Sequence, residues 1–233
     1  YPGYLTRDQI RDNPKQVQTG YAGLGTQTIE PGTTFVADRT TIRIDDQSKL
    51  VVGFAYLNAP MNHELGSTSS LYNIDYATGM VDYKRHDSLL GHDSDTDIGI
   101  YTSHDLTATI DNRVRVQSAY PGYAIGTLVT RTHLGGSDTV FHVRNNTEIF
   151  HNFWLTAAGA LGYTPRSGAQ TYPQTSSFSQ NALYFAPRAG FRYVINPNVE
   201  IYGNVTRSVQ SPQDWQYLSG AVYTSGIAAG LTS

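Results

Sequence analysis

Residues 182–212 read ALYFAPRAGFRYVINPNVEIYGNVTRSVQSP, and this stretch decides the fold of the chain. Apolar and polar side chains alternate in two segments, which Asn196-Pro197-Asn198 separates. Side chains of a β-strand point alternately to its two faces, and Asn and Pro favour tight turns. The stretch therefore predicts a β-hairpin with one apolar and one polar face. The apolar face of its first strand comprises Leu183, Phe185, Ala189, Phe191, Tyr193 and Ile195.

The composition excludes several classes of protein. The 233 residues carry a net charge of −3, and their 16 lysines and arginines are spread too thinly to form a footprint for nucleic acid. The absence of cysteine removes disulfide frameworks, thiolate metal sites and cysteine nucleophiles. Neither a G-x-S-x-G elbow nor an H-E-x-x-H motif occurs. We therefore expect neither an enzyme nor a bound cofactor.

Membrane-spanning helices are not expected either, because the sequence has no run of 18 apolar residues. The most apolar stretch, FWLTAAGALGY at 153–163, instead has the length of a tilted transmembrane β-strand, about 9–11 residues. Phe153, Trp154, Tyr163 and Tyr193 lie at predicted strand ends. Aromatic residues in such places are typical of the girdles that anchor membrane barrels at the lipid interface.

Alternation predicts further strands along the chain. It is clear at 33–44, 49–57, 138–149 and 154–163, and weaker at about 100–117 and 124–133. Short polar turns lie at 45–48, 150–153 and 196–198, whereas 58–99, 164–181 and the residues beyond 210 read as long polar loops. Residues 1–32 read as an ordered loop, in which Thr6 to Gln9 has capping-box spacing and starts a short helical turn that Pro14 ends.

The alternation of short and long connections places every short turn at one end of the predicted sheet. Outer-membrane barrels have this asymmetry, with short periplasmic turns and long extracellular loops. A β-sandwich does not systematically need it. The pattern therefore predicts an all-β fold, an antiparallel transmembrane β-barrel with about 8–10 strands in this chain.

The hairpin also resembles that of a known family, the TonB-dependent outer-membrane receptors. Their hairpin reads P-R-x-G-x-x-Y…N-x-x-L-Y-x-N-x-S-R-S-x-x-x-P, and the residues here that match it in order are Pro187-Arg188-Ala189-Gly190, Tyr193, Tyr202, Asn204 and Thr206-Arg207-Ser208. Residues 1–16, YPGYLTRDQIRDNPKQ, resemble the P-G-x-L-T-R-x-Q-x-x-x-x-P-x-Q loop of the ferric-citrate-receptor-like (siderophore receptor) branch. Residues 138–163 fit the strand, turn and strand that precede this hairpin in the family, whereas 58–133 matches little of it.

The resemblance implies a receptor in the outer membrane of a Gram-negative bacterium. Such a receptor takes up an iron chelate, a ferric siderophore or a ferric-citrate-like complex. Its partners are outer-membrane lipid, the chelate and a TonB-type periplasmic energy transducer.

The family pattern has parts that this sequence lacks. Members have a 22-stranded barrel, an N-terminal plug domain and an energy-coupling box, and neither of the last two is visible here. At about ten residues per strand plus loops, 233 residues cannot hold 22 strands. We therefore expect residues 1–233 to be a partial barrel domain without a plug, a fragment that does not transport on its own.

The densest polar cluster includes His92, Asp93, Asp95 and Asp97. The three aspartates, at a spacing of two, begin like a calcium-binding loop. The match fails further on, because Ile98 stands where such loops have glycine and His104 where they have glutamate. We expect a solvated acidic loop, and a metal site at these four residues is the alternative.

An anionic ferric chelate would need guanidinium or ammonium donors. The candidates are Lys84, Arg85 and His86 in the long loop, Arg166 just past the 154–163 strand, and Arg207 near the extracellular end of the last strand. The alternative for each is a lumen or loop charge in a local ion pair. Arg188 and Arg192 alternate to the polar side of the hairpin, where they would face a plug or lumen water.

Two further functions stay open at this point. A self-contained barrel of eight to ten strands, acting as a passive pore or adhesin, would require residues near 33 to pair with residues near 205. A secreted soluble β-protein that binds glycans through its tyrosines would bury the apolar hairpin face between two sheets. A membrane barrel would instead expose Leu155, Leu161, Leu183, Phe185, Phe191 and Ile195 to lipid.

Overall fold

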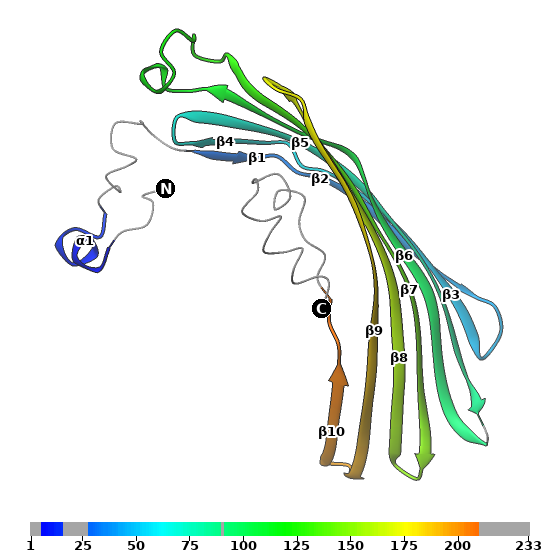
Figure 1. Ribbon diagram of the computed structural model, residues 1–233. Coiled ribbons are helices and arrows are strands. Elements are labelled where there is room, and N and C mark those ends of the chain that lie inside the picture. The colour runs from blue at the N-terminus through cyan, green and yellow to red at the C-terminus, as the bar shows by residue number, and fades with distance from the viewer. Residues whose placement is uncertain (1–5, 16–27, 90, 210–233) are drawn as a thin grey trace.

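The computed structural model describes residues 6–15, 28–89 and 91–209. Ten strands in these ranges form one antiparallel sheet. Figure 1 shows the sheet as a single curved layer with β10 along one edge. The strands are β1 (Ile29–Pro31), β2 (Thr34–Arg43), β3 (Ser48–Asn58), β4 (Met61–Leu65), β5 (Thr68–Leu89), β6 (His92–Val114), β7 (Leu128–Phe150), β8 (Phe153–Tyr172), β9 (Ser176–Asn196) and β10 (Val199–Thr206).

The described helices are short. Helix α1 (Arg7–Asp12) starts at Thr6, whose hydroxyl accepts the backbone N–H of Gln9, and the Gln9 side chain accepts the backbone N–H of Thr6. This confirms the predicted capping box. The 3₁₀ helix η2 (Gln117–Ala119) lies between β6 and β7. No helix in the described ranges is both long and apolar enough to span a membrane.

The first four strands occupy only two positions in the sheet. β3 and β4 both pair with β5, while β2 pairs with β3 and β1 with β4. Pro60 interrupts the ladder between β3 and β4, because proline has no N–H to donate, and its carbonyl accepts the N–H of Gly32 at 2.7 Å. Ten strands therefore fill eight positions, which confirms the predicted eight to ten strands.

The middle strands are much longer than a bilayer requires. β5 to β9 contain 22, 23, 23, 20 and 21 residues. A tilted transmembrane strand needs about 9–11 residues. The prediction of long polar loops at 58–99 and 164–181 is therefore wrong. Residues 58–99 form β4, β5 and the start of β6, and 164–181 contain the ends of β8 and β9 around a connection at 173–175.

Polar pairs across the strands explain why alternation failed in these segments. Ser69 donates to Asn62 at 2.7 Å and Ser70 donates to Asn112 at 2.5 Å. Asn112 in turn donates to Thr130 on β7 at 2.7 Å. In a strand with water on both faces, the backbone N–H and C=O groups bond to the neighbouring strands and neither face has to be apolar. The sequence of such a strand therefore lacks alternation and resembles that of a loop.

One end of the sheet carries the short turns, as predicted. β2 joins β3 through 44–47, β7 joins β8 through 151–152, and β9 joins β10 through 197–198. In the first turn the Asp45 carboxylate accepts the N–H groups of Gln47 at 2.8 Å and Ser48 at 2.7 Å, and the Gln47 bond in particular lowers the pKa of Asp45. The opposite end was predicted to carry long loops, but among the connections between described strands only 115–127 is long there. The connections 66–67 and 173–175 are short, because the strands themselves extend through the predicted loops.

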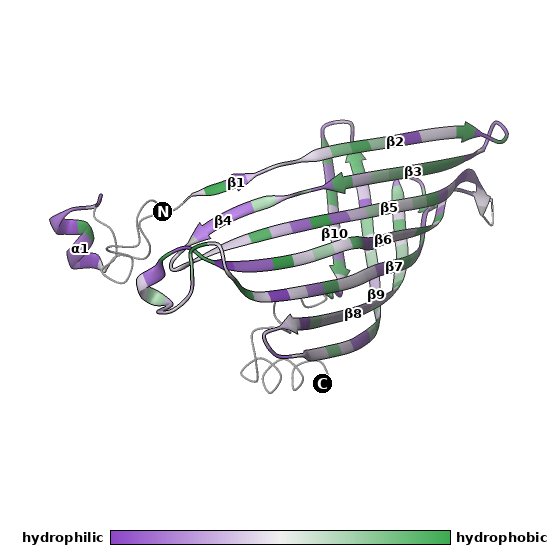
Figure 2. Cartoon of the chain, turned by 90° about the horizontal axis from the view of Figure 1, so that it is seen from above, coloured by the Kyte–Doolittle hydropathy of each residue, from purple (hydrophilic) through white to green (hydrophobic). Residues whose placement is uncertain are grey.

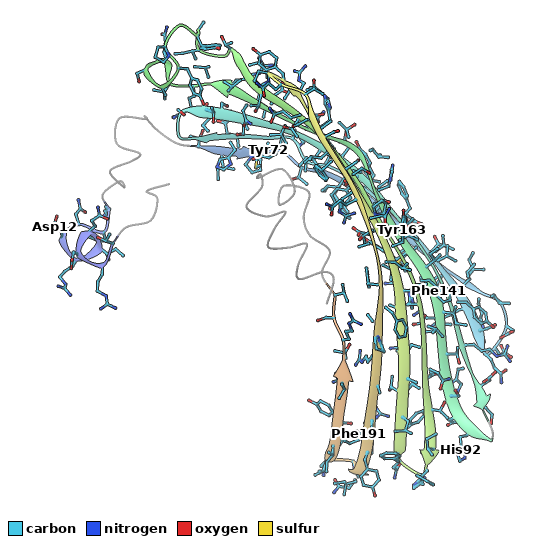
Figure 3. The ribbon with its side chains drawn as sticks, viewed as in Figure 1. Asp12, Tyr72, His92, Phe141, Tyr163 and Phe191 are labelled. Carbon is cyan, nitrogen blue, oxygen red and sulfur yellow. The ribbon has the colours of Figure 1, made fainter. Side chains whose placement is uncertain are left out.

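The two faces of the sheet differ in polarity. Directly paired residues share a face, and one such row crosses six strands: Phe185, Leu161, Phe141, Ile100, Val81 and Val52. Phe141 and Tyr163 from this face lie on the convex side of the sheet, and Tyr72 from the opposite face lies on the concave side (Figure 3). Figure 2 shows hydrophobic and hydrophilic residues alternating along the strands. We call the convex side the outer face and the concave side the inner face.

Exposure of the outer face decides between the fold alternatives. The six residues that a membrane barrel exposes are 42–70 % accessible: Leu155, Leu161, Leu183, Phe185, Phe191 and Ile195. A soluble sandwich would bury them, and no second sheet covers them in the described part of the chain. A self-contained barrel is not formed there either, because β10 pairs only with β9 and not with residues near 33.

The aromatic girdle forms at the short-turn end. The rings of Phe150 and Phe191 each lie 6.3 Å from the ring of Phe153, and that of Tyr193 lies 6.1 Å from it. Trp154 was predicted to join them but faces inward, since it pairs with Arg192, whose guanidinium lies 5.7 Å from the centre of the indole ring. Trp154 therefore belongs to the inner face.

Candidate functional site

The inner face of β5, β6 and β7 carries a compact group of charged side chains. Sheet register places Asp82, Gly99 and His142 in one row and Lys84, Asp97 and Arg144 in the next. Alternate residues of a strand share a face, so all of these side chains project to the same side. We call Asp82, Lys84, Asp97, His142 and Arg144 the inner-wall cluster.

The inner-wall cluster pairs two carboxylates with two permanent cations. Lys84 Nζ lies 2.6 Å from Asp97 Oδ2, and an Arg144 nitrogen lies 3.4 Å from the same oxygen. His142 Nε2 lies 3.5 Å from Asp82 Oδ1 and 3.6 Å from Asp97 Oδ1. Both aspartates retain only 8 % of their accessible surface. The two carboxylates are therefore shielded from bulk water, whereas the Arg144 side chain is 53 % exposed.

Gly99 provides the space in which the cluster converges. A Cβ at this position would lie 2.0 Å from Asp82 Oδ1 and 2.7 Å from His142 Cε1. Asp82 and His142 come from the strands on either side, and they can lean over β6 only because residue 99 has no side chain. The glycine thus brings together groups from three strands.

Further cations line the inner face near the short-turn end. A pocket of about 390 Å³ is lined by Arg144, Arg188 and Arg192 together with Asp95, Tyr202 and Asn204. A neighbouring pocket of about 490 Å³ includes Lys84, His86, Asp97 and Arg144. His86 Nδ1 lies 2.9 Å from Asp95 Oδ1. This part of the wall thus presents mixed charge with several arginines.

The predicted acidic loop is a strand. His92, Asp93, Asp95 and Asp97 all belong to β6, with His92 opposite Leu89 beside the turn. Alternate residues of a strand lie about 6.8 Å apart, so the three aspartates cannot surround one ion as a calcium loop does. Asp97 instead lies close to Asp82 and His142, and one donor atom from each of the three falls within 4.8 Å of the others. Sequence reasoning missed Asp82 and His142, because only the register of β5 and β7 against β6 reveals their proximity.

The first group of predicted chelate ligands is placed differently from expectation. Lys84, Arg85 and His86 lie on β5 beside the short-turn end and not in a long extracellular loop. Lys84 and His86 face inward. Arg85 shares the outer face with its partners Ser48 and Thr96, and it pairs with Asp87. The triplet therefore divides between the two faces, because side chains alternate along a strand.

The other two predicted ligands also differ in setting. Arg166 makes two hydrogen bonds of 2.8 Å to the carboxylate of Asp138 and donates to the Ser137 carbonyl at 2.6 Å, with its side chain 12 % exposed. This is the local ion pair that the alternative described. Arg207 is exposed and directly follows Thr206, the last residue of β10, as predicted. Its backbone N–H bonds to Pro187 O at 3.1 Å, so this end of β10 lies beside the middle of β9.

The fold and the site define a section of a large antiparallel β-barrel wall, apolar outside and charged inside. Neither a protein-family model nor a curated protein sequence matches the chain.

Several solved structures are similar to the chain, and two of them are described here. One is the ferric citrate transporter FecA in the unliganded form, with a TM-score of 0.68, 14 % identity, and coverage of 87 % of this chain and 30 % of that chain. The other is the ferric yersiniabactin uptake receptor FyuA from Yersinia pestis, with a TM-score of 0.54, 8 % identity, and coverage of 76 % of this chain and 28 % of that one. The chain spans less than a third of either protein, and it has the fold of part of such a receptor barrel, as the 182–212 hairpin predicted.

Proposed function

We propose that this chain forms part of the wall of an outer-membrane receptor that takes up an iron chelate. The observation that carries the proposal is the two-faced sheet. Its outer face has an apolar row across six strands, and its inner face has a charged cluster beside two pockets that charged side chains line. A bilayer requires an apolar outside, and an aqueous or plugged lumen tolerates charge inside. The fold likeness to two iron-chelate receptors favours uptake as the role.

The inner face suits an anionic chelate. Arg144, Arg188 and Arg192 line one pocket, and Lys84 adds an ammonium group on the neighbouring strand pair. Arginine presents a planar fork of donors that matches carboxylate, and clustered cations raise the local concentration of anions. The chelate class that we infer is therefore a ferric complex of carboxylate-bearing ligands. Capture by Lys84, Arg85, His86, Arg166 and Arg207 together is not part of this proposal, since the structure separates them.

Energy for uptake would come from the inner membrane through a TonB-type periplasmic transducer. We assign residues 1–233 to the barrel domain alone, so the plug on which such a transducer acts would be supplied by another segment. The proposal therefore predicts that uptake requires an energised inner membrane. A passive pore would not show this dependence.

Disruption of the gene that encodes this chain tests the proposal. Uptake of radioactive iron from ferric citrate and from a carboxylate siderophore is compared in the disrupted strain and its parent, with and without a protonophore. We expect energy-dependent uptake of at least one anionic chelate to fall to background and to return on complementation. Complementation with the Arg144→Ala, Arg188→Ala, Arg192→Ala triple variant should raise the half-saturating chelate concentration, whereas Arg11→Ala on helix α1, which lines neither pocket, should not.

Two outcomes would count against the proposal. Unchanged uptake of every anionic ferric chelate in the disrupted strain would refute the receptor role. If disruption abolishes uptake but the protonophore does not reduce uptake in the parent strain, the chain would instead belong to a passive pore.

A further inference from the structure

We propose that Asp82, Asp97 and His142 form a binding site for one divalent transition-metal ion on the inner wall. The site is built from β5, β6 and β7. It does not depend on the identity of the transported chelate, and it would hold the ion by protein side chains.

The spacing of the donor atoms fits a metal ion better than it fits direct hydrogen bonds. His142 Nε2 lies 3.5 Å from Asp82 Oδ1 and 3.6 Å from Asp97 Oδ1. Strong bonds between imidazole and carboxylate are about 2.7–2.9 Å long. Ligands bound at about 2.0–2.2 Å to a tetrahedral ion lie about 3.3–3.6 Å from one another. His142 therefore forms no strong hydrogen bond with either carboxylate, and one donor atom from each of the three residues lies within 4.8 Å of the others. We call the region between these three atoms the shared space.

One carboxylate oxygen of Asp97 is buried without a hydrogen-bond partner among the described residues. Its Oδ2 accepts from Lys84 at 2.6 Å, but its Oδ1 is fully buried and has no hydrogen-bond partner among the described residues. Asp97 as a whole is 8 % exposed. An unpaired buried carboxylate oxygen is costly, and an ion in the shared space would satisfy it.

Gly99 makes the shared space possible. The Cβ of any other residue at this position would overlap Asp82 Oδ1 and crowd the His142 ring. The glycine lies between the two ligand strands in the row that contains Asp82 and His142. Its lack of a side chain is therefore a structural requirement of the site.

The donor set indicates the kind of ion. One imidazole nitrogen with two carboxylate oxygens suits zinc, iron(II), cobalt(II) or manganese(II), whereas calcium and magnesium prefer oxygen ligands alone. Lys84 and Arg144 approach the other oxygen of Asp97 and offset part of the negative charge. We therefore expect selective binding of transition metals by three protein ligands, with water completing the coordination.

Cobalt(II) is the probe for the test, because its visible absorption reports ligand number and geometry. The whole encoded protein, folded in detergent micelles, is titrated with cobalt(II) and then with competing zinc(II), magnesium or calcium. We expect one equivalent to bind, zinc to displace it, and magnesium and calcium to leave it in place. His142→Gln and Asp82→Asn should each weaken binding at least about tenfold. His86→Gln is the matched control, since His86 pairs with Asp95 on the same face outside the proposed site.

A second measurement needs no substitution. Zinc should protect His142 from modification by diethylpyrocarbonate, read by mass spectrometry, while His86 stays reactive. Absence of cobalt binding to the folded wild-type protein would overturn the proposal, as would equal affinity of the His142→Gln variant or unprotected His142. Any of these results would leave the cluster as direct contacts between His142 and the two aspartates, without an ion.

Discussion

Replacing Phe185 with arginine is expected to destabilise the membrane-inserted protein by about 2–4 kcal/mol, because a guanidinium on the lipid face near the middle of a bilayer has that cost. Phe185 ends the apolar row on β9, is 54 % exposed on the outer face and pairs with Leu161. The free energy of unfolding from lipid vesicles in denaturant measures the effect.

The neighbouring residue provides the control. Ala186 follows Phe185 on the same strand and faces inward, opposite Ala160. Arginine at this position enters a polar lumen, so Ala186→Arg should change the free energy of unfolding far less than Phe185→Arg. Equal destabilisation by the two variants would contradict the assignment of faces.

Removing the Asp138 carboxylate is expected to cost about 2–3 kcal/mol of unfolding free energy. Asp138→Ala removes both carboxylate oxygens to which one guanidinium nitrogen of Arg166 donates, and the Arg166 side chain is only 12 % exposed. Breaking a buried ion pair on one side costs about 3–5 kcal/mol, and the 36 % exposure of the Asp138 side chain reduces this through solvent screening. Denaturant titration in detergent micelles measures the change.

Asp46→Ala is the matched control for this prediction. Asp46 also pairs with an arginine, Arg43, at 2.6 Å, but the two side chains are 96 % and 72 % exposed. Exposed pairs contribute little, so the unfolding free energy should stay the same within error. A loss for Asp46→Ala as large as that for Asp138→Ala would show that burial does not govern the strength of these pairs.

Strand segments with one apolar face were predictable from the sequence. The 182–212 hairpin has an apolar side chain at most second positions, and the predicted turn at 196–198 lies between β9 and β10. The 138–149 and 154–163 segments follow the same rule and fall within β7 and β8. Where one face meets lipid, period two is therefore a sufficient signal.

Strand segments outside the apolar band were not predictable in this way. Residues 68–76 on β5 read TSSLYNIDY, and neither face of that segment needs to be apolar. Their pairing partners lie on β4 and β6, so only the register reveals that the segment is a strand. Predictions that fall on residues 1–5, 16–27 and 210–233, including the final loop, lie outside the described residues.

The inner-wall cluster shows the same limit for a site. Asp97 was singled out for its acidic neighbours in sequence, yet the residues that surround it are Asp82, Lys84, His142 and Arg144. That Gly99 lies opposite both Asp82 and His142 is visible only when β5, β6 and β7 are aligned in register. Sequence neighbours along a strand diverge to opposite faces, whereas residues on adjacent strands meet.

Site-directed spin labelling along β9 tests most directly whether this sheet is a membrane wall. The chain contains no cysteine, so single cysteines can be placed at positions 183–186 and 190–195 without background labelling. Accessibility to oxygen, which concentrates in lipid, and to a water-soluble nickel complex is then measured for the protein in vesicles. We predict that labels at 183, 185, 191, 193 and 195 contact lipid and that labels at the even positions contact water. If labels at the odd positions are inaccessible to both reagents, as in the core of a soluble sandwich, the assignment of this sheet to a membrane wall would be contradicted.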